Sequence, residues 1–122
     1  MNPPRLILAS VSPRRAELLK QFNLEFQIVP GDASEIHHEQ LTAQETSQIN
    51  AYRKARSVAK KLPDALVLGA DTVVYLDGRL FGKPRDLADA HRMLEELQGQ
   101  THQVVTGVCL IHVRAHRQKV FA

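Results

Sequence analysis

Residues 10–15 combine two serine hydroxyls with two consecutive arginines, in the order Ser-Val-Ser-Pro-Arg-Arg. Ser12 and Pro13 predict the start of a helix, because serine caps helices and proline suits the first helical position. The free backbone N–H groups at a helix start, together with the partial positive charge there, bind phosphate. Arginine adds a planar guanidinium that matches pairs of phosphate oxygens. The segment therefore fits a phosphate site, although a plain capped helix with solvated arginines fits it equally well.

Asp71 follows an apolar run at 65–70. Such a run is typical of a strand inside a sheet, and ligands of open α/β sheets gather at the carboxyl ends of strands. A carboxylate at that place could hold Mg²⁺ or accept a proton from water. The alternative is an aspartate that closes a turn by accepting a hydrogen bond from its own backbone.

Two lysines could add positive charge to such a site. Lys83 stands between Gly82 and Pro84, on a short, stiff stretch from which it could reach a phosphate. Lys54 stands in a long helical stretch, where most lysines face water. Neither lysine indicates a function by itself.

Other kinds of site are not indicated. His37 and His38 are adjacent and point apart in an extended chain. His112 and His116 stand in a strand-and-turn pattern, so no zinc-type spacing is present. The Gly-rich nucleotide-binding loops and the Gly-x-Ser-x-Gly elbow are absent as well. Cys109 is the single cysteine, so an internal disulfide is excluded. It lies in an apolar run, which favours a buried, inert thiol.

The composition is ordinary for a globular chain of 122 residues, with 43% hydrophobic and 24% charged residues, and we expect one domain over 1–122. The formal charge of +3 suits an anionic ligand without indicating nucleic acid, and 5% aromatic residues leave few platforms for stacking bases. No apolar stretch is long enough to cross a bilayer, and none has the form of a signal peptide. We therefore expect no membrane partner and a cytoplasmic location.

The elements that would position these residues alternate between strand and helix, which predicts an α/β sheet. Helices are expected from Pro13 to about Phe22, from Ala43 to Leu62, and after a capping Asp86 until Gly99. The apolar positions of the long helix near helical spacing are Ile49, Tyr52, Ala55, Val58, Ala59 and Leu62. Strand patterns cover 5–9, 26–29, 65–70, 72–76, 79–81 and 103–113, with a hairpin turn at Asp77-Gly78.

The last residues look unfinished. Residues 114–119 have a turn-like pattern, and Val120-Phe121 resembles the first part of a partner strand for 103–113. Because 103–113 is apolar along its length, we expect its neighbours to cover both faces and both edges. An uncovered edge should seek another chain. We therefore expect the C-terminal part of the domain to be missing. We also expect the chain to self-associate or to be poorly soluble, and a homodimer is one possible form.

Taken together, these segments resemble the Maf family of nucleotide pyrophosphatases. The resemblance runs in order along almost the whole chain and rests on residues 8–15, 54–55, 69–74, 82–84, 93–99 and 102–108. It implies an α/β fold similar to that of inosine triphosphate pyrophosphatases, with a cleft beside a long mixed sheet. It also implies hydrolysis of a nucleoside triphosphate between the α and β phosphates, to a monophosphate and pyrophosphate, with Mg²⁺ or Mn²⁺ as the divalent cation.

The resemblance assigns roles to individual residues. Asp71 falls where the family has its catalytic base and a metal ligand, and Glu35 stands in the loop where the family often has an acidic residue near the metal. Arg14 and Thr72 stand where the dTTP/UTP type differs from the 7-methyl-GTP type, and here they match the dTTP/UTP type. The positions that match the family's phosphate contacts are Ser10, Ser12, Arg14, Arg15, Lys54 and Lys83.

One departure and two alternatives stay open. Family members continue beyond this C-terminus with a glutamine linked to base selection and a Lys-Ala-Gly-x-Tyr-Gly segment, so the activity of this chain is open. For an enzyme of this kind the expected partner is a small nucleotide substrate. The first alternative is a non-catalytic module that binds a nucleotide. A nucleic-acid binder acting in division control is the second, against which the dispersed charge and scarce aromatics count.

Overall fold

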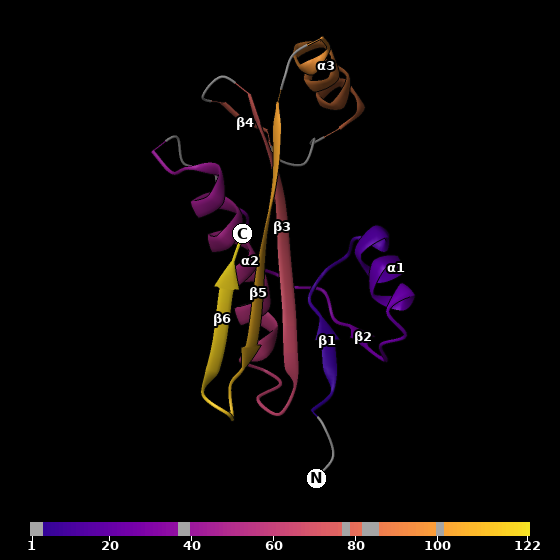
Figure 1. The fold of residues 1–122 in the computed structure, drawn as a ribbon, viewed down its shortest axis with the longest axis vertical. Helices are drawn as coiled ribbons and strands as arrows, with labels where there is room; N and C mark the ends of the chain where they lie inside the picture. The colour runs from indigo at the N-terminus through magenta and orange to yellow at the C-terminus, as the bar shows by residue number, and fades with distance from the viewer. Residues whose placement is uncertain (1–3, 37–39, 77–78, 82–85, 100–101) are drawn as a thin grey trace.

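The computed structural model describes residues 4–36, 40–76, 79–81, 86–99 and 102–122 (Figure 1). Within these residues the strands are β1 (Leu6–Leu8), β2 (Gln27–Ile28), β3 (Leu66–Leu76), β4 (Arg79–Phe81), β5 (Gln103–His112) and β6 (Arg117–Phe121). The helices are α1 (Pro13–Gln21), α2 (Ala43–Ala59) and α3 (Leu87–Leu97). The predicted α/β class is confirmed.

One mixed sheet contains all of these strands, in the order β2-β1-β3-β5-β6, with β4 beside β3. The short β1 runs parallel to β2 and β3, whereas β5 runs antiparallel to β3 and β6. The patterns at 65–70 and 72–76 are one continuous strand, so Asp71 lies inside β3 and not after its end. The predicted turn at Asp77-Gly78 lies outside the described residues, and the strands before and after it pair antiparallel.

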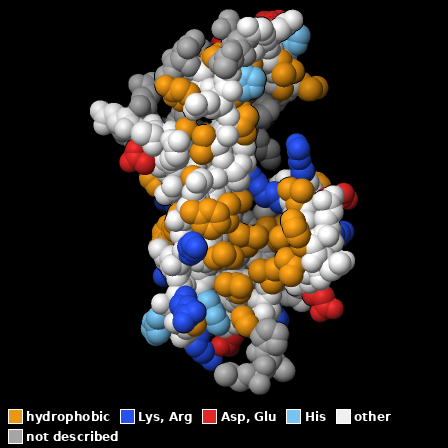
Figure 2. All heavy atoms as spheres, in the orientation of Figure 1, with side chains coloured by type: hydrophobic (Ala, Val, Ile, Leu, Met, Phe, Trp, Pro, Cys, Tyr) orange, Lys and Arg blue, Asp and Glu red, His pale blue; other side chains and the backbone are white. Residues whose placement is uncertain are grey.

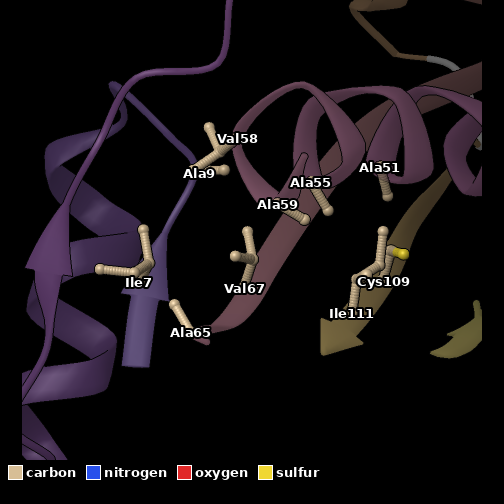
Figure 3. Packing of buried hydrophobic residues seen from close by; sticks show 10 residues of the cluster. All are labelled: Ile7, Ala9, Ala51, Ala55, Val58, Ala59, Ala65, Val67, Cys109 and Ile111. Carbon is tan, nitrogen blue, oxygen red and sulfur yellow. The ribbon is translucent and has the colours of Figure 1, made fainter. Parts of the chain in front are cut away.

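Small residues allow α2 to approach the sheet closely. The core between them is built from alanines and small aliphatic residues of α2, β1, β3 and β5, as Figure 3 shows. A methyl group added at Gly69 would lie 2.5 Å from the carbonyl oxygen of Ala51, and one at Gly107 would lie 2.3 Å from the carbonyl carbon of Ser47. The buried face of α2 therefore follows its small residues, whereas the predicted Ile49 and Tyr52 are only partly buried.

The helix ends agree in part with the expected signals. Thr42 and Glu45 form a capping box before α2 that the sequence analysis did not identify, and its hydrogen bonds lower the pKa of Glu45. Asp86 caps α3 by accepting from the Asp89 N–H at 2.8 Å. Ser12 is the N-cap residue of α1, but its side chain makes no cap hydrogen bond. The α2 helix also ends at Ala59, before the expected Leu62, because a turn precedes Pro63.

The last strand is more complete than its pattern suggested. The turn is confined to 113–116, and β6 is a full strand that pairs with residues 108–112 of β5. Its start at Arg117 was missed because Arg117, Gln118 and Lys119 are polar, as an edge strand facing solvent allows. Over residues 108–111 both edges of β5 are paired.

The face of the sheet opposite α2 is only partly covered. Figure 2 shows hydrophobic side chains gathered across this face beside α1. A hollow of about 600 Å³ lies there, with Leu8, Leu18, Leu19, Leu68, Ala70, Val104 and Val108 among its lining residues. Among the described residues only α2 packs closely on β5, so the cover that we expect for the second face of this strand is not present within them.

The helix α3 stands at the far end of the long β3–β5 pair (Figure 1). None of its residues is buried, and Leu94 of its predicted apolar face is 67% exposed. Among the described residues no helix has the length and apolar character needed to cross a membrane. The cytoplasmic location stays a prediction.

Candidate functional site

Asp71 occupies the middle of β3, on the face that α2 covers. Its backbone pairs with Gly107 of β5, and the residue is 4% exposed. The neighbouring strand β1 is much shorter and stops at Leu8, which pairs with Leu68. The carboxylate therefore lies just beyond the carboxyl end of a parallel strand, where α/β sheets place their ligands.

Lys54 brings an ammonium group from α2 to this carboxylate. Its Nζ lies 3.1 Å from Asp71 Oδ1 and 3.1 Å from Glu35 Oε1. The Lys54 side chain is 19% exposed, between a Glu35 side chain at 30% and an Asp71 side chain at 5%. Two carboxylates from distant parts of the sequence thus converge on one cation, in a place where water screens their charges only partly.

Asn50 holds the other oxygen of Asp71. Its Nδ2 donates to Asp71 Oδ2 at 3.3 Å and to the Ile36 carbonyl at 3.0 Å, while its Oδ1 accepts from the Ile36 N–H at 2.7 Å. Because Ile36 follows Glu35, the same helix face positions both acidic residues. Asn50 was missed in the sequence, although it stands four residues before Lys54 and therefore on the same face of the helix.

The segment between β1 and α1 forms a second wall. Ser10 is buried at 7% exposure, and its Oγ accepts from the Ser12 N–H at 3.0 Å. The following helix starts at Pro13 and directs its N-terminal turn to the same cleft. The Nη2 of Arg15 donates to Thr72 Oγ1 at 3.1 Å. A helix start with a serine hydroxyl and a guanidinium beside it is suited to hold phosphate.

Thr72 and Thr106 form a bridge on the opposite face of the two central strands. Their hydroxyl oxygens lie 3.0 Å apart, and either could donate. Because Thr72 Oγ1 also accepts from Arg15, the bridge fixes the position of that guanidinium. Thr106 was not singled out in the sequence, and only its register opposite Thr72 explains its place.

One cleft of about 470 Å³ unites most of the predicted residues. It is lined by Ser10, Ser12, Arg15, Glu35, Lys54, Asp71 and Thr72. Arg14 does not line it and instead faces the apolar hollow on the other side, which shares Ser12, Arg15 and Thr72 with the cleft. Lys83 lies outside the described residues.

Asp71 and Glu35 are the two carboxylates of a candidate metal site. No group of three or more His, Cys, Asp or Glu side chains converges within the described part of the chain, so these residues alone form no complete metal cage. Asp71 and Glu35 nevertheless both reach the position of one cation, which Lys54 Nζ takes. Mg²⁺ is commonly held by one or two carboxylates together with substrate phosphates. The donor set fits this mode.

Two solved structures share the fold. A nucleoside-triphosphatase / dITP/XTP pyrophosphatase from Mycobacterium abscessus has a TM-score of 0.58 at 18% identity, over 95% of this chain and 69% of its own. The Ham1 protein of Staphylococcus aureus has a TM-score of 0.60 at 19% identity, over 96% and 67%. At these identities the likeness shows the fold alone, and it places the chain in the α/β class of these two proteins.

The family follows from the sequence comparison. The model described as Maf-like protein matches residues 5–122, and the chain belongs to this family. The dTTP/UTP pyrophosphatase of Acetivibrio thermocellus is 49% identical over 120 residues, which cover 93% of this chain and 60% of that protein. The dTTP/UTP pyrophosphatase of Ruminiclostridium cellulolyticum is 46% identical over 107 residues, covering 87% and 55%. The chain thus spans little more than half the length of these relatives.

Proposed function

We propose that the protein hydrolyses nucleoside triphosphates, with dTTP and UTP preferred, to the monophosphate and pyrophosphate. The observation that carries the proposal is the ion cluster of Lys54, Asp71 and Glu35 in a cleft that the start of α1 also lines. The relatives support it, since two proteins that share nearly half of their matched residues with this chain are dTTP/UTP pyrophosphatases.

In the proposed reaction a water oxygen attacks the α phosphorus, and the bond from that phosphorus to the bridging oxygen of the β phosphate breaks. Asp71 orients this water and takes its proton. Both carboxylate oxygens already accept one hydrogen bond, from Lys54 and Asn50, and each retains a lone pair for water. The leaving pyrophosphate carries the electron pair of the broken bond. Cationic groups in the cleft stabilise its negative charge.

Among the described residues, Lys54 and Arg15 are the cationic side chains that line this cleft. Lys54 would exchange one of its carboxylate partners for a phosphate oxygen when the triphosphate enters. Arg15 is held by Thr72 at the rim, so its fork needs little reorganisation to meet the phosphates. Preorganised charge of this kind acts on the transition state at small cost.

Asp71 and Glu35 would hold Mg²⁺ or Mn²⁺ together with the phosphates of the substrate. When bound, the ion neutralises phosphate charge and polarises the phosphorus–oxygen bonds. In the proposed active state Lys54 exchanges one of these two carboxylates for a phosphate oxygen.

The preference for dTTP and UTP is proposed to depend on Arg14 and Thr72. Both line the apolar hollow beside the cleft, where a base attached to the bound triphosphate would find apolar contacts and two polar side chains. The polar groups would distinguish bases by their hydrogen-bonding edges, because a buried polar group without its partner costs binding free energy.

A panel of nucleoside triphosphates with Mg²⁺, analysed for both products, tests the proposal. Monophosphate and pyrophosphate should appear in equal amounts, with the highest kcat/KM for dTTP and UTP and a low value for 7-methyl-GTP. In oxygen-18 water the label should enter the monophosphate, because water attacks the α phosphorus. Release of inorganic phosphate and a nucleoside diphosphate would refute the proposal. Tight nucleotide binding without turnover would also refute it and would favour a non-catalytic binding module.

A further inference from the structure

The helix α2 holds the acidic loop at 34–36 through consecutive contacts. Arg53 donates to the Ser34 carbonyl at 3.1 Å and to the Ser34 hydroxyl at 3.3 Å. Lys54 reaches Glu35, and Asn50 binds the backbone of Ile36 through both its amide oxygen and its amide nitrogen. The loop is therefore fixed by side chains of one helix and not by a strand ladder.

Asn50 differs from the other two side chains in its burial. It is 1% exposed, whereas Arg53 and Lys54 are partly accessible. A buried amide must satisfy one acceptor and two donors or lose free energy. Here the acceptor meets the Ile36 N–H, and the amide nitrogen meets the Ile36 carbonyl and Asp71 Oδ2. All hydrogen-bonding groups of the side chain are matched.

This pattern also defines which way the amide points. A flipped amide would direct its oxygen at the Ile36 carbonyl and at the Asp71 carboxylate, and would leave the Ile36 N–H without an acceptor. Only a side chain that both accepts and donates at this length satisfies the three groups together. Leucine has the volume without the groups, and aspartate has the shape without the donors.

We propose that Asn50 is a positioning residue that sets the Asp71 carboxylate and the Glu35 loop in one geometry. The proposal rests on the proposed function, in which these two carboxylates act on the same substrate. Asn50 does not touch the substrate in this account. It limits the rotation of the Asp71 carboxylate by binding Oδ2, and it holds Glu35 through the adjacent residue, so that both acids face the cleft before the nucleotide arrives.

The substitution Asn50→Leu removes all three hydrogen bonds and keeps the volume. We expect kcat for dTTP to fall by about 10–100-fold, the usual range for groups that orient the residues of a site. The KM should stay within about threefold, because the serines and arginine of the phosphate wall are untouched. The Ile36 amide should exchange faster with solvent, and Mn²⁺ titrated alone should bind about tenfold more weakly.

The substitution Asn50→Asp keeps the acceptor for the Ile36 N–H but removes the donations to the Ile36 carbonyl and to Asp71 Oδ2. Exchange of the Ile36 amide should stay slow while kcat falls by about tenfold or more. Ser47→Ala is the matched control, since Ser47 is equally buried on α2 and its hydroxyl donates only to the Gln44 carbonyl. This control should keep kcat within about twofold.

The outcomes separate this inference from the proposed function. A wild-type protein without turnover refutes the proposed function. In that case, hydrogen exchange of the Ile36 amide and the affinity for Mn²⁺ still test whether Asn50 positions the two acidic residues. In an active protein, kcat within about threefold of wild type in both Asn50 variants overturns the positioning role. A fall in kcat that Ser47→Ala reproduces overturns it as well. Failure of both Asn50 variants to fold, with Ser47→Ala folded, would make Asn50 a core residue and also overturn it.

Discussion

Lys54 Nζ lies 3.1 Å from Asp71 Oδ1, across the contact between α2 and the central strand. The lysine stands in a helix and the aspartate inside a strand, and the pair is largely shielded from solvent. A pair in such a place is expensive to form without additional hydrogen bonds, which Glu35 and Asn50 supply. The relationship joins the packing of α2 on the sheet to the chemistry of the cleft.

Replacement of Lys54 should slow the reaction. For Lys54→Met we expect kcat/KM to fall by a factor equivalent to about 1.5–3 kcal/mol, the range of hydrogen bonds to charged groups. Lys61→Met is the control, because Lys61 meets Asp32 at 3.7 Å in an exposed pair that contributes little. Steady-state kinetics with dTTP would measure both. Equal values of kcat/KM for the two variants would show that Lys54 does not take part in the reaction.

The two arginines of α1 should weaken binding when truncated. Arg14→Ala and Arg15→Ala are each expected to reduce the binding free energy of a nonhydrolysable triphosphate analogue by about 1.5–3 kcal/mol. Calorimetry measures this directly. Arg114→Ala serves as the control, since Arg114 pairs with Asp64 in an exposed ion pair at a distance of 2.8 Å. If both α1 variants bind like the control, the segment is only a helix start with solvated arginines.

Close packing of α2 predicts that Gly107 does not tolerate a side chain. A methyl group there would lie 2.4 Å from the Ser47 carbonyl oxygen, so the helix must shift. Gly107→Ala should lower the free energy of unfolding by about 1–3 kcal/mol, the usual cost of overpacking. Gly99→Ala is the comparison, because Gly99 has a φ of 72° and open space around it. Its cost should be about 1 kcal/mol from backbone strain alone. Urea unfolding that ranks Gly99→Ala as the more damaging change would contradict the packing.

Burial raises the pKa of the Cys109 thiol to about 11. A thiol reagent at pH 8 should therefore modify the folded protein slowly and the urea-unfolded protein rapidly. The unfolded thiol ionises at lower pH than the folded one. The contribution of Cys109 to stability is thus complete below the ordinary thiol pKa and is lost as the pH rises toward about 11. Wild type should lose more stability than Cys109→Ala over that interval, and an equal loss would show that the thiol is not responsible.

The sequence predicted the order of the elements well, because hydrophobic period and turn signals are local properties. It predicted the buried face of α2 less well. The large apolar residues near helical spacing suggested the core, but glycines in β3 and β5 allow the helix to pack through Ala51, Ala55 and Ser47. Periodicity analysis weighs size and apolarity, and it does not detect a close approach that depends on glycines in other elements.

The site was predicted in its parts and not in its arrangement. Asp71 was expected after a strand because Gly69-Ala70-Asp71 ends the most apolar run, yet the antiparallel partner β5 extends the strand past it. The bridge between Thr72 and Thr106 depends on the register of that pairing, which no local pattern encodes. Asn50 could have been found from its spacing to Lys54, since a polar residue one turn before a site residue shares its face.

The substitution Asp71→Asn tests the central claim most directly. It keeps the shape of the side chain and removes its charge and basicity, so pyrophosphate release from dTTP should fall by about 100-fold or more while affinity for a nonhydrolysable analogue changes little. Initial rates of pyrophosphate release by wild type and variant, measured at equal saturation with Mg²⁺ present, are the decisive quantity. A variant that retains more than about a tenth of the wild-type rate would show that Asp71 is not the base, and would contradict the account of the site.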